Sequence, residues 1–240
     1  MIELRRPAGR FARVGHRGAS ALAPENTTEA FALAVELGCD MLELDVLAKT
    51  DGAIVVAHDS RHLRDPGLVT FDEVLAFFGE RLPDVGLQVD LKRRGIERQV
   101  VDALRRHGML ERSWVSGFDA DALRDIADLE PALPRSFTYP RDRLGVSKRG
   151  PLAPVVRGAL TGFGASLPRR IPALIGRSRA TALTLHYSVV TREVIERAHE
   201  LDAPVYVWTV DDRGLVERLA HWEADGIITN DPRVFAGLTT

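Results

Sequence analysis

Residues 12–31 read ARVGHRGASALAPENTTEAF. The pattern begins as a short apolar strand and passes into the start of a helix. Val14 and His16 stand two apart, so they share one face of the predicted strand. His16, Arg17 and Gly18 come where the strand ends, which places a titratable ring beside a fixed cation at a loop. Taken alone, these residues are more typical of a core histidine, a surface arginine and a turn glycine, so the rest of the chain decides their meaning.

Asn26, with Glu29 three residues further on, fits a variant of the capping box and predicts that a helix opens here. Apolar β-type runs then alternate with helical runs. We expect strands at 12–16, 40–46 (continuing at 53–57), 86–91, 113–116, 134–138, 182–186, 204–209 and 226–229, helices at 28–37, 71–78, 97–107, 120–129, 191–201 and 212–220, and a last turn from 232. This alternation favours an α/β fold, a single-domain (β/α)8 TIM barrel over residues 1–240. A doubly wound open sheet is the alternative, which the lack of a G-x-G-x-x-G or P-loop motif disfavours.

Composition narrows the class of protein. The chain has 240 residues, of which 45% are apolar, so it can bury a sizeable core, and its net charge of −2 gives no sign of a nucleic-acid partner. Cys39 is the one cysteine in the sequence, which excludes an internal disulfide. Residues 1–10 lack the apolar region of a signal peptide, and no run of about 18 apolar residues is present. We therefore expect a cytoplasmic protein.

Two carboxylates come from the second predicted strand, DMLELDV at 40–46. Glu43 and Asp45 stand two apart, so both project from one face, and the flanking leucines indicate burial. Like charges on a buried face repel, so one must take up a proton or a cation must lie between them. Carboxylate oxygens at this spacing suit Mg²⁺ or Ca²⁺. The ordinary alternative is a strand edge with both groups in water.

Chemically active residue types also follow the neighbouring strands. The apolar run 53–57 leads into His58, and Asp90 and Lys92 share one face of the next strand, although a turn histidine and a buried ion pair are the ordinary alternatives. In a barrel the strand ends converge on one rim, which gathers seven residues: His16, Arg17, Glu43, Asp45, His58, Asp90 and Lys92. A divalent ion and the cations would neutralise a phosphate. One histidine would protonate a leaving oxygen while the other removes a proton from the attacking group.

At these residues the sequence resembles the glycerophosphodiester phosphodiesterase family. The segments that carry the resemblance are His16-Arg17-Gly18, Pro24-Glu25-Asn26-Thr27, Glu43-Leu44-Asp45, His58-Asp59, Asp90-Leu91-Lys92, Trp208-Thr209-Val210 and Asp225-Gly226-Ile227-Ile228-Thr229-Asn230-Asp231-Pro232. The resemblance implies the (β/α)8 barrel of the phospholipase C-like phosphodiesterases. It implies hydrolysis of a phosphodiester to an alcohol and glycerol 3-phosphate or its acylated form. It also implies roles for the residues: His16 and His58 as the acid–base pair, Glu43, Asp45 and Asp90 as ligands of a divalent metal, Mg²⁺ or Ca²⁺, and Arg17 and Lys92 as phosphate contacts.

Two features depart from the family's pattern. Asp90 stands where the family usually has glutamate, and its shorter side chain would move the ion or admit a water ligand. Sphingomyelinase D-type phosphodiesterases look similar at this position, so an enzyme that forms a cyclic phosphate is an alternative. The family often carries an insertion after its second histidine, whereas here only eleven residues, 60–70, separate His58-Asp59 from the helix at Phe71. We expect a substrate pocket that is open on this side.

The segment 135–179 holds ten basic residues and one acidic residue. It also contains apolar residues, interrupted by proline and glycine, among them Phe163, Leu167 and Ile171. We expect a cationic, partly apolar lid on the catalytic rim that rests on anionic lipid, or else a solvated helical excursion. Such a lid would admit lysophospholipids as substrates and let the protein lie peripherally on a membrane.

The sequence thus favours a metal-dependent phosphodiesterase that acts on glycerophosphodiesters, including lysophospholipids. Phe118 and Trp208 are predicted to wall the substrate pocket, although such residues lie more often in the core. A non-catalytic module that binds lipid surfaces through 135–179 is the alternative from another class of protein. It has no need of two histidines and three carboxylates on one rim, which argues against it.

Overall fold

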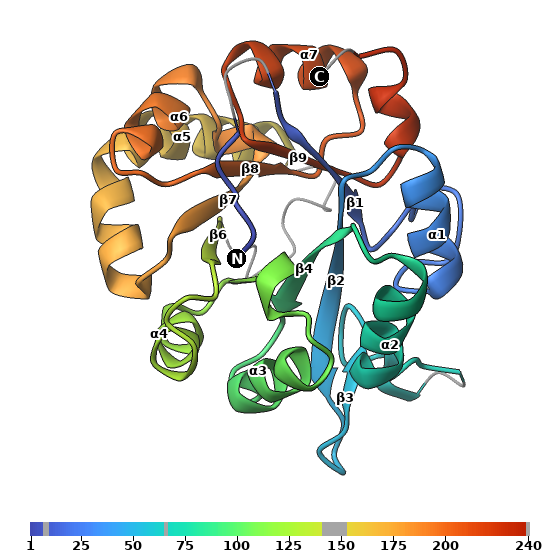
Figure 1. Cartoon of the computed structure of the whole chain (residues 1–240). Helices are drawn as coiled ribbons and strands as arrows, with labels where there is room; N and C mark the ends of the chain where they lie inside the picture. Colours follow the sequence, from blue (N-terminus) through green and yellow to red (C-terminus); the bar gives the residue numbers. More distant parts are fainter. Residues whose placement is uncertain (7–9, 65–66, 141–152, 239–240) are drawn as a thin grey trace.

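The computed structural model describes residues 1–6, 10–64, 67–140 and 153–238, with side chains for all of these except Arg64 and residues 153–165. Eight strands in this part of the chain close into a barrel, since β1 (Ala12–His16) pairs with both β2 (Met41–Ala48) and β9 (Gly226–Thr229). Between them lie β4 (Gly86–Leu91), β5 (Ser113–Gly117), β6 (Arg135–Tyr139), β7 (Ala182–His186) and β8 (Val205–Trp208). All eight run parallel inside a ring of helices (Figure 1), and the predicted (β/α)8 barrel is confirmed.

Helices cover the outside of the barrel. They are α1 (Thr28–Glu36), α2 (Phe71–Arg81), α3 (Glu97–Arg106), α4 (Ala120–Leu129), α5 (Ala153–Ser178), α6 (Arg192–His199) and α7 (Arg213–His221), with short 3₁₀ turns at η1 (His62–Arg64), η2 (Leu110–Arg112), η5 (Tyr187–Val189) and η6 (Pro232–Phe235). Local capping fixes several of their starts, as at η6, where the Asp231 carboxylate accepts a hydrogen bond from the Arg233 N–H. Within the described ranges, no helix combines the length and apolarity needed to cross a bilayer.

The stretch 53–57 does not continue the second barrel strand. β3 (Ile54–Val56) runs antiparallel to the end of β2, because the chain reverses at 49–53, where Gly52 adopts φ +87°. Glycine reaches this left-handed conformation without a steric penalty. The hairpin returns the chain to the carboxyl end of β2, where the Ala57 N–H donates to the Asp45 carbonyl at 3.0 Å. His58 follows directly, so the hairpin delivers this histidine to the barrel rim.

The cap of the first helix differs from the predicted one. Thr27 caps α1, because its hydroxyl accepts a hydrogen bond from the Ala30 N–H at 3.2 Å. Asn26, the predicted cap, has φ +61° and a buried side chain that contacts Asp45 on β2. Asparagine tolerates the left-handed conformation better than most residues with a side chain. The prediction of Asn26 as the cap was therefore wrong by one residue.

Alternation along β2 decides which side chains reach the interior of the barrel. Leu42, Leu44 and Val46 join the large core between the barrel and its helices. Met41 belongs instead to a smaller apolar cluster with Leu4, Ala12, Val14, Trp114, Ala182, Tyr206 and Ile228. Glu43 and Asp45 follow Met41 in steps of two residues, so they share its face nearer the carboxyl end of the strand. An apolar layer thus fills the barrel interior toward the amino-terminal ends of the strands, and charged groups occupy the interior at the carboxyl ends.

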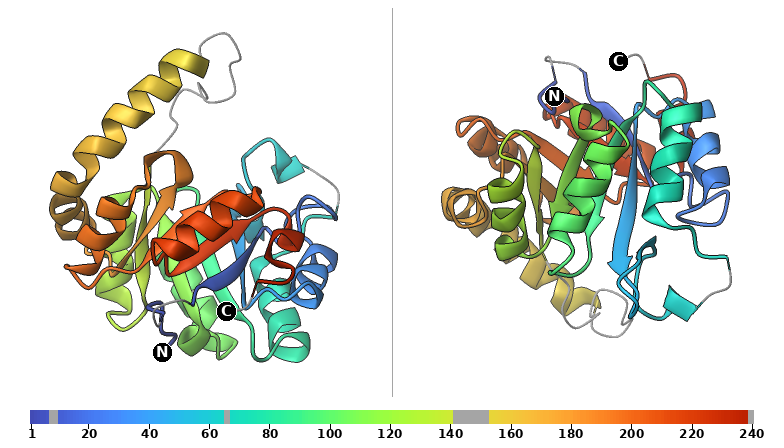
Figure 2. Two further views of the ribbon diagram at one scale, coloured as in Figure 1. Left: turned by 90° about the horizontal axis from the view of Figure 1, so that it is seen from above. Right: turned by 60° about the horizontal axis from the view of Figure 1, so that its bottom comes forward.

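The structure of α5 differs from the predicted lid, in which apolar residues interrupted by proline and glycine would face lipid. It is a 26-residue helix that contains both Pro168 and Pro172. Leu167 and Ile171, one helical turn apart, are fully buried in the main core, so they cannot cover an acyl chain. The burial of these two side chains stabilises the helix and compensates for the backbone hydrogen bonds that the two prolines remove. The side chain of Phe163 lies outside the described ones, and the amino-terminal half of α5 projects beyond the barrel (Figure 2, left).

Candidate active site

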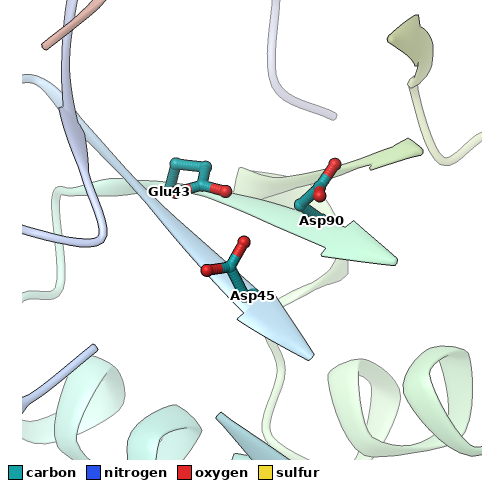
Figure 3. Close-up of side chains that lie close together, drawn as sticks. All are labelled: Glu43, Asp45 and Asp90. Carbon is teal, nitrogen blue, oxygen red and sulfur yellow. The ribbon is translucent and has the colours of Figure 1, made fainter. Parts of the chain in front are cut away.

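Three buried carboxylates meet at the carboxyl ends of β2 and β4 (Figure 3). Glu43 and Asp45 come from β2, and Asp90 comes from β4, where it is in register with Asp45. One oxygen of each carboxylate lies within 4.8 Å of the others. None of the three residues is more than 4% exposed. The two-residue spacing on β2 therefore places two carboxylates inward, and the parallel register supplies the third.

Two cationic side chains form ion pairs with Asp45. Lys92 Nζ lies 2.5 Å from Asp45 Oδ1 and 2.5 Å from Asp90 Oδ2, and Arg17 Nε lies 2.8 Å from Asp45 Oδ2. Burial acts to raise the pKa of Asp45, but its cationic neighbours, Lys92 above all, lower it well below its usual range. Burial also opposes the charge on Lys92, yet the two aspartates raise its pKa above the ordinary value. Asp45 and Lys92 are therefore charged at neutral pH.

The negative charge of Glu43 is less well compensated by neighbouring cations than the negative charge of Asp45. Its Oε2 accepts a hydrogen bond from the Arg17 N–H at 3.0 Å, and His16 Nε2 lies 4.0 Å from the same oxygen. Burial and the neighbouring charge of Asp45 raise the pKa of Glu43 well above its ordinary value. A proton or a further cation at Glu43 would relieve this repulsion.

The donor set fits a divalent metal ion. Three buried carboxylates meet two cations, Lys92 and Arg17, and Arg17 also pairs with the more exposed Glu25, so at least one buried negative charge lacks a cationic partner. Closely spaced carboxylate oxygens are the ligands that Mg²⁺ and Ca²⁺ prefer, and such an ion would supply the missing positive charge. The carboxylates that the sequence predicts as ligands therefore come together as a candidate metal site.

The two predicted histidines lie beside different carboxylates. His58 Nδ1 is 3.3 Å from Asp45 Oδ2, and 34% of its side chain is exposed. His16 lies by Glu43 and is only 13% exposed. Burial, reinforced by the positive charge of Arg17, lowers the pKa of His16 to about 4. The His16 ring is therefore neutral at neutral pH and keeps a lone pair that can accept a proton.

Two asparagines contact the site in ways that sequence reasoning missed. Asn26 Nδ2 donates to Asp45 Oδ2 at 3.1 Å, and the Asp45 N–H donates to Asn26 Oδ1 at 3.3 Å. Asn230 Oδ1 lies 2.7 Å from His16 Nδ1. Both asparagines stand beside helix starts, where this residue type is common, so the local pattern offered a sufficient explanation. The sequence signal that could have identified both asparagines is their position inside two of the segments that resemble the family, 24–27 and 225–232.

A hydrogen-bond chain supports Asp90 from the neighbouring strand. Ser116 on β5 donates to Asp90 Oδ1 at 2.6 Å, and Gln88 Nε2 donates to the Ser116 hydroxyl at 2.9 Å. All three residues are buried. Buried acceptors with fixed donors hold one orientation, so this chain of hydrogen bonds orients the carboxylate of Asp90.

The two predicted aromatic wall residues contact each other. The rings of Phe118, directly after β5, and Trp208, at the end of β8, lie 6.0 Å apart in an edge-to-face arrangement, and both side chains are partly buried. His186 at the end of β7 packs edge-on against Trp208 at 5.1 Å. The strand ends on this side of the rim therefore carry a group of three contacting rings, from Phe118, Trp208 and His186.

The basic residues of 135–179 do not form one surface in the described part of the chain. Arg135 is buried and donates to the carbonyls of Pro131 and Leu133. Arg179 pairs with Asp128, and Arg170 lies over the ring of Tyr139 at 5.4 Å. Five further basic groups lie outside the described side chains: Arg141, Arg143, Lys148, Arg149 and Arg157.

Comparison with known proteins gives a consistent result. The model of the "Glycerophosphoryl diester phosphodiesterase family" matches residues 16–71 and 68–234. A curated glycerophosphodiester phosphodiesterase of Caldanaerobacter subterraneus subsp. tengcongensis is 29% identical over 94% of this chain and 96% of its own. A putative glycerophosphoryl diester phosphodiesterase from Silicibacter pomeroyi superposes with a TM-score of 0.76 at 22% identity, covering 98% of this chain and 95% of its own. An Oleispira antarctica phosphodiesterase, solved with its product sn-glycerol-3-phosphate, superposes with a TM-score of 0.70 at 19% identity, covering 95% and 96%.

Proposed function

The chain belongs to the glycerophosphoryl diester phosphodiesterase family, and on this basis we propose that it hydrolyses glycerophosphodiesters to glycerol 3-phosphate and an alcohol, using a divalent metal ion and two histidines. The observation that carries the proposal is the group of three buried carboxylates with His16 and His58 beside it. The likeness to a phosphodiesterase solved with sn-glycerol-3-phosphate supports this class of substrate.

Glu43, Asp45 and Asp90 would hold the Mg²⁺ or Ca²⁺ ion. When bound, such an ion compensates charge on the phosphate and draws electron density from its oxygens. Arg17 and Lys92 add fixed positive charge beside the same carboxylates, which favours the binding of an anionic phosphodiester. Phe118 and Trp208 would form an apolar wall for the bound substrate.

The two histidines have surroundings that suit different parts of the reaction. His58 lies beside the ionised Asp45, which can balance a positive ring, so this histidine is suited to give a proton to the departing alcohol. His16, with a pKa lowered to about 4, is neutral and suited to take a proton from the attacking water. The anionic Asp45 beside His58, and the burial of His16 next to the cation Arg17, thus separate the acid from the base.

Metal removal tests the proposal. Excess chelator should abolish turnover of glycerophosphocholine, and Mg²⁺ or Ca²⁺ in excess of the chelator should restore it. Glu43→Gln should lower both activity and metal content. Asp102→Asn is the matched control, because Asp102 is an exposed carboxylate that pairs with Arg105 on α3. Full turnover in chelator, with no metal found by elemental analysis, would contradict metal dependence.

Attack by a hydroxyl of the substrate is the second candidate reaction, which Asp90 in place of glutamate favours by the resemblance to sphingomyelinase D-type enzymes. The product would then be a cyclic phosphate. Turnover in ¹⁸O-labelled water separates the two reactions, because direct hydrolysis places the label in the phosphate and cyclisation does not. Label in the phosphate from the first turnover supports hydrolysis. A cyclic product without label supports the alternative.

Lysophospholipids are a proposed further class of substrate. The short connection 60–70 and the projecting half of α5 favour an open pocket, but Leu167 and Ile171 are unavailable to an acyl chain. Higher kcat/KM on lysophosphatidylcholine than on glycerophosphocholine would support this class, and the reverse by about tenfold would refute it. Charge reversal of the exposed Arg169 tests the predicted contact with anionic membranes, since it should reduce activity only on anionic vesicles.

A further inference from the structure

We propose that Asp211 and Asn230 are positioning residues that fix the ring of His16 in the tautomer with its proton on Nδ1. This inference rests on the proposed acid–base role of His16 and adds the two residues that prepare it. Asp211 follows β8, and Asn230 follows β9, the strand that closes the barrel against β1. Neither residue belongs to the metal site, and the sequence patterns assigned neither to catalysis.

The carboxylate of Asp211 determines which way the amide of Asn230 faces. Asp211 Oδ2 lies 2.7 Å from Asn230 Nδ2, while Oδ1 accepts the Asn230 N–H at 2.7 Å and the Thr229 hydroxyl at 2.9 Å. An ionised carboxylate only accepts hydrogen bonds, so the group facing Oδ2 must be the amide nitrogen. The amide oxygen of Asn230 is therefore turned the other way, toward His16.

The orientation of that amide fixes the tautomer of the ring. Asn230 Oδ1 lies 2.7 Å from His16 Nδ1 and also accepts the Ser20 hydroxyl at 2.9 Å. An amide oxygen has no proton to give, so His16 Nδ1 must be the donor. A neutral imidazole carries one proton, which leaves the lone pair on Nε2. This nitrogen lies 4.0 Å from Glu43 Oε2, on the side of the carboxylates where the reaction would occur.

Exchanging the two side-chain types gives a sharp test. In Asp211→Asn the new amide oxygen keeps its two donors, Thr229 and the Asn230 N–H, and its NH₂ group then opposes Asn230 Nδ2. Two donors repel, so the Asn230 amide rotates and offers NH₂ to His16, which moves the ring proton to Nε2. In the double variant Asp211→Asn/Asn230→Asp the carboxylate at 230 accepts from both sides, so the proton returns to Nδ1.

The tautomer is read directly from the ¹⁵N shifts of the histidine ring. The full chain, loaded with Mg²⁺ and labelled at its seven histidines, is measured at neutral pH, and the His16 signals are assigned by their loss in His16→Gln. We expect Nδ1–H in the wild type, Nε2–H in Asp211→Asn and Nδ1–H in the double variant. A wrong tautomer of a catalytic histidine can cost up to about 10⁴ in kcat. We expect kcat to fall at least about tenfold in Asp211→Asn, with KM little changed, and to recover in the double variant.

Asp212→Asn is the matched control, because Asp212 caps α7 and asparagine also serves as a helix cap. Its tautomer and kcat should equal those of the wild type. Nε2–H in wild-type His16 overturns the proposal, even where a variant does not fold. Loss of kcat in Asp211→Asn without a change of tautomer, or a change of tautomer without loss of kcat, also overturns it. Failure of the acid–base role would show separately, as full turnover in His16→Gln.

Discussion

Asn26 and Asp45 hold each other through two hydrogen bonds: Asn26 Nδ2 donates to Asp45 Oδ2 at 3.1 Å, and the Asp45 N–H donates to Asn26 Oδ1 at 3.3 Å. Both residues are buried. The amide therefore spans the backbone and the carboxylate of one residue and restrains the direction of that carboxylate. A residue next to the α1 cap thus supports the candidate metal site from outside the set of ligands.

Asn26→Ala should weaken metal binding by about 10–100-fold, because it frees the orientation of Asp45. It should also destabilise the fold by about 1–3 kcal/mol, because buried hydrogen-bonding groups lose their partner. Thr27→Ala is the control, since it removes the α1 cap at a cost of about 1 kcal/mol and leaves Asp45 in place. Calorimetric titration with Mg²⁺ and thermal unfolding measure both effects. Equal metal affinity in the two variants would contradict the role of Asn26.

Glu43→Gln should stabilise the metal-free protein at neutral pH. The pKa of Glu43 is raised on folding, so the folded state binds more protons than the unfolded state, and stability falls as the pH rises above the ordinary glutamate value. Glutamine removes that loss. Asp45→Asn should act in the opposite direction, because it breaks the ion pairs with Lys92 and Arg17. Melting curves of metal-free protein across pH give the comparison, and the same sign for both variants would refute it.

The two histidines should differ in their dependence on the leaving group. His16→Ala and His58→Ala are each expected to lower kcat by about 10²–10⁴ on glycerophosphocholine. If His58 protonates the departing alcohol, a nitrophenol leaving group needs no such proton, so His58→Ala should lose much less activity on that substrate. His16→Ala should lose activity on both. The reverse pattern would exchange the two roles, and near-wild-type kcat in either variant on the alcohol substrate would remove that residue from catalysis.

Gly18→Ala should disrupt the approach of the His16–Arg17 loop to α1. Gly18 has φ +81°, and an added Cβ would lie 2.5 Å from the Ala30 carbonyl carbon. Gly52→Ala is the control, because it shares a positive φ of +87° but meets nothing within 4 Å, so only backbone strain of about 1–2 kcal/mol applies. Thermal unfolding and kcat should both suffer more in Gly18→Ala. Equal losses in the two variants would mean that the close contact is unimportant.

Leu167→Ala should destabilise the protein by about 2–5 kcal/mol, because the side chain is fully buried in the main core. Arg169→Ala, on the exposed face of the same helix, should stay within about 0.5 kcal/mol. Denaturant unfolding measures both. A mild effect of Leu167→Ala, accompanied by lower activity on lysophospholipid vesicles, would revive the lipid-facing interpretation of this helix.

The sequence by itself determined the barrel and its acidic rim. Alternating strand and helix patterns depend on side-chain directions that repeat every two or about 3.6 residues, and these are local properties of the backbone. Glu43 and Asp45 could therefore be placed on one buried face, and the motif order indicated that His16, His58, Asp90 and Lys92 belong to the same site. The structure brings all of these residues together.

The tertiary structure alone decided how that site is held. Asn26 contacts Asp45 across 19 positions and Asn230 contacts His16 across 214, and no local period encodes such pairs. Lys92 and Arg17 both favour Asp45 over Glu43, which follows from distances between strands and not from spacing along one strand. The packing of Leu167 likewise overrides the helix-breaking tendency of two nearby prolines, because burial in a core assembled from distant segments outweighs a local preference.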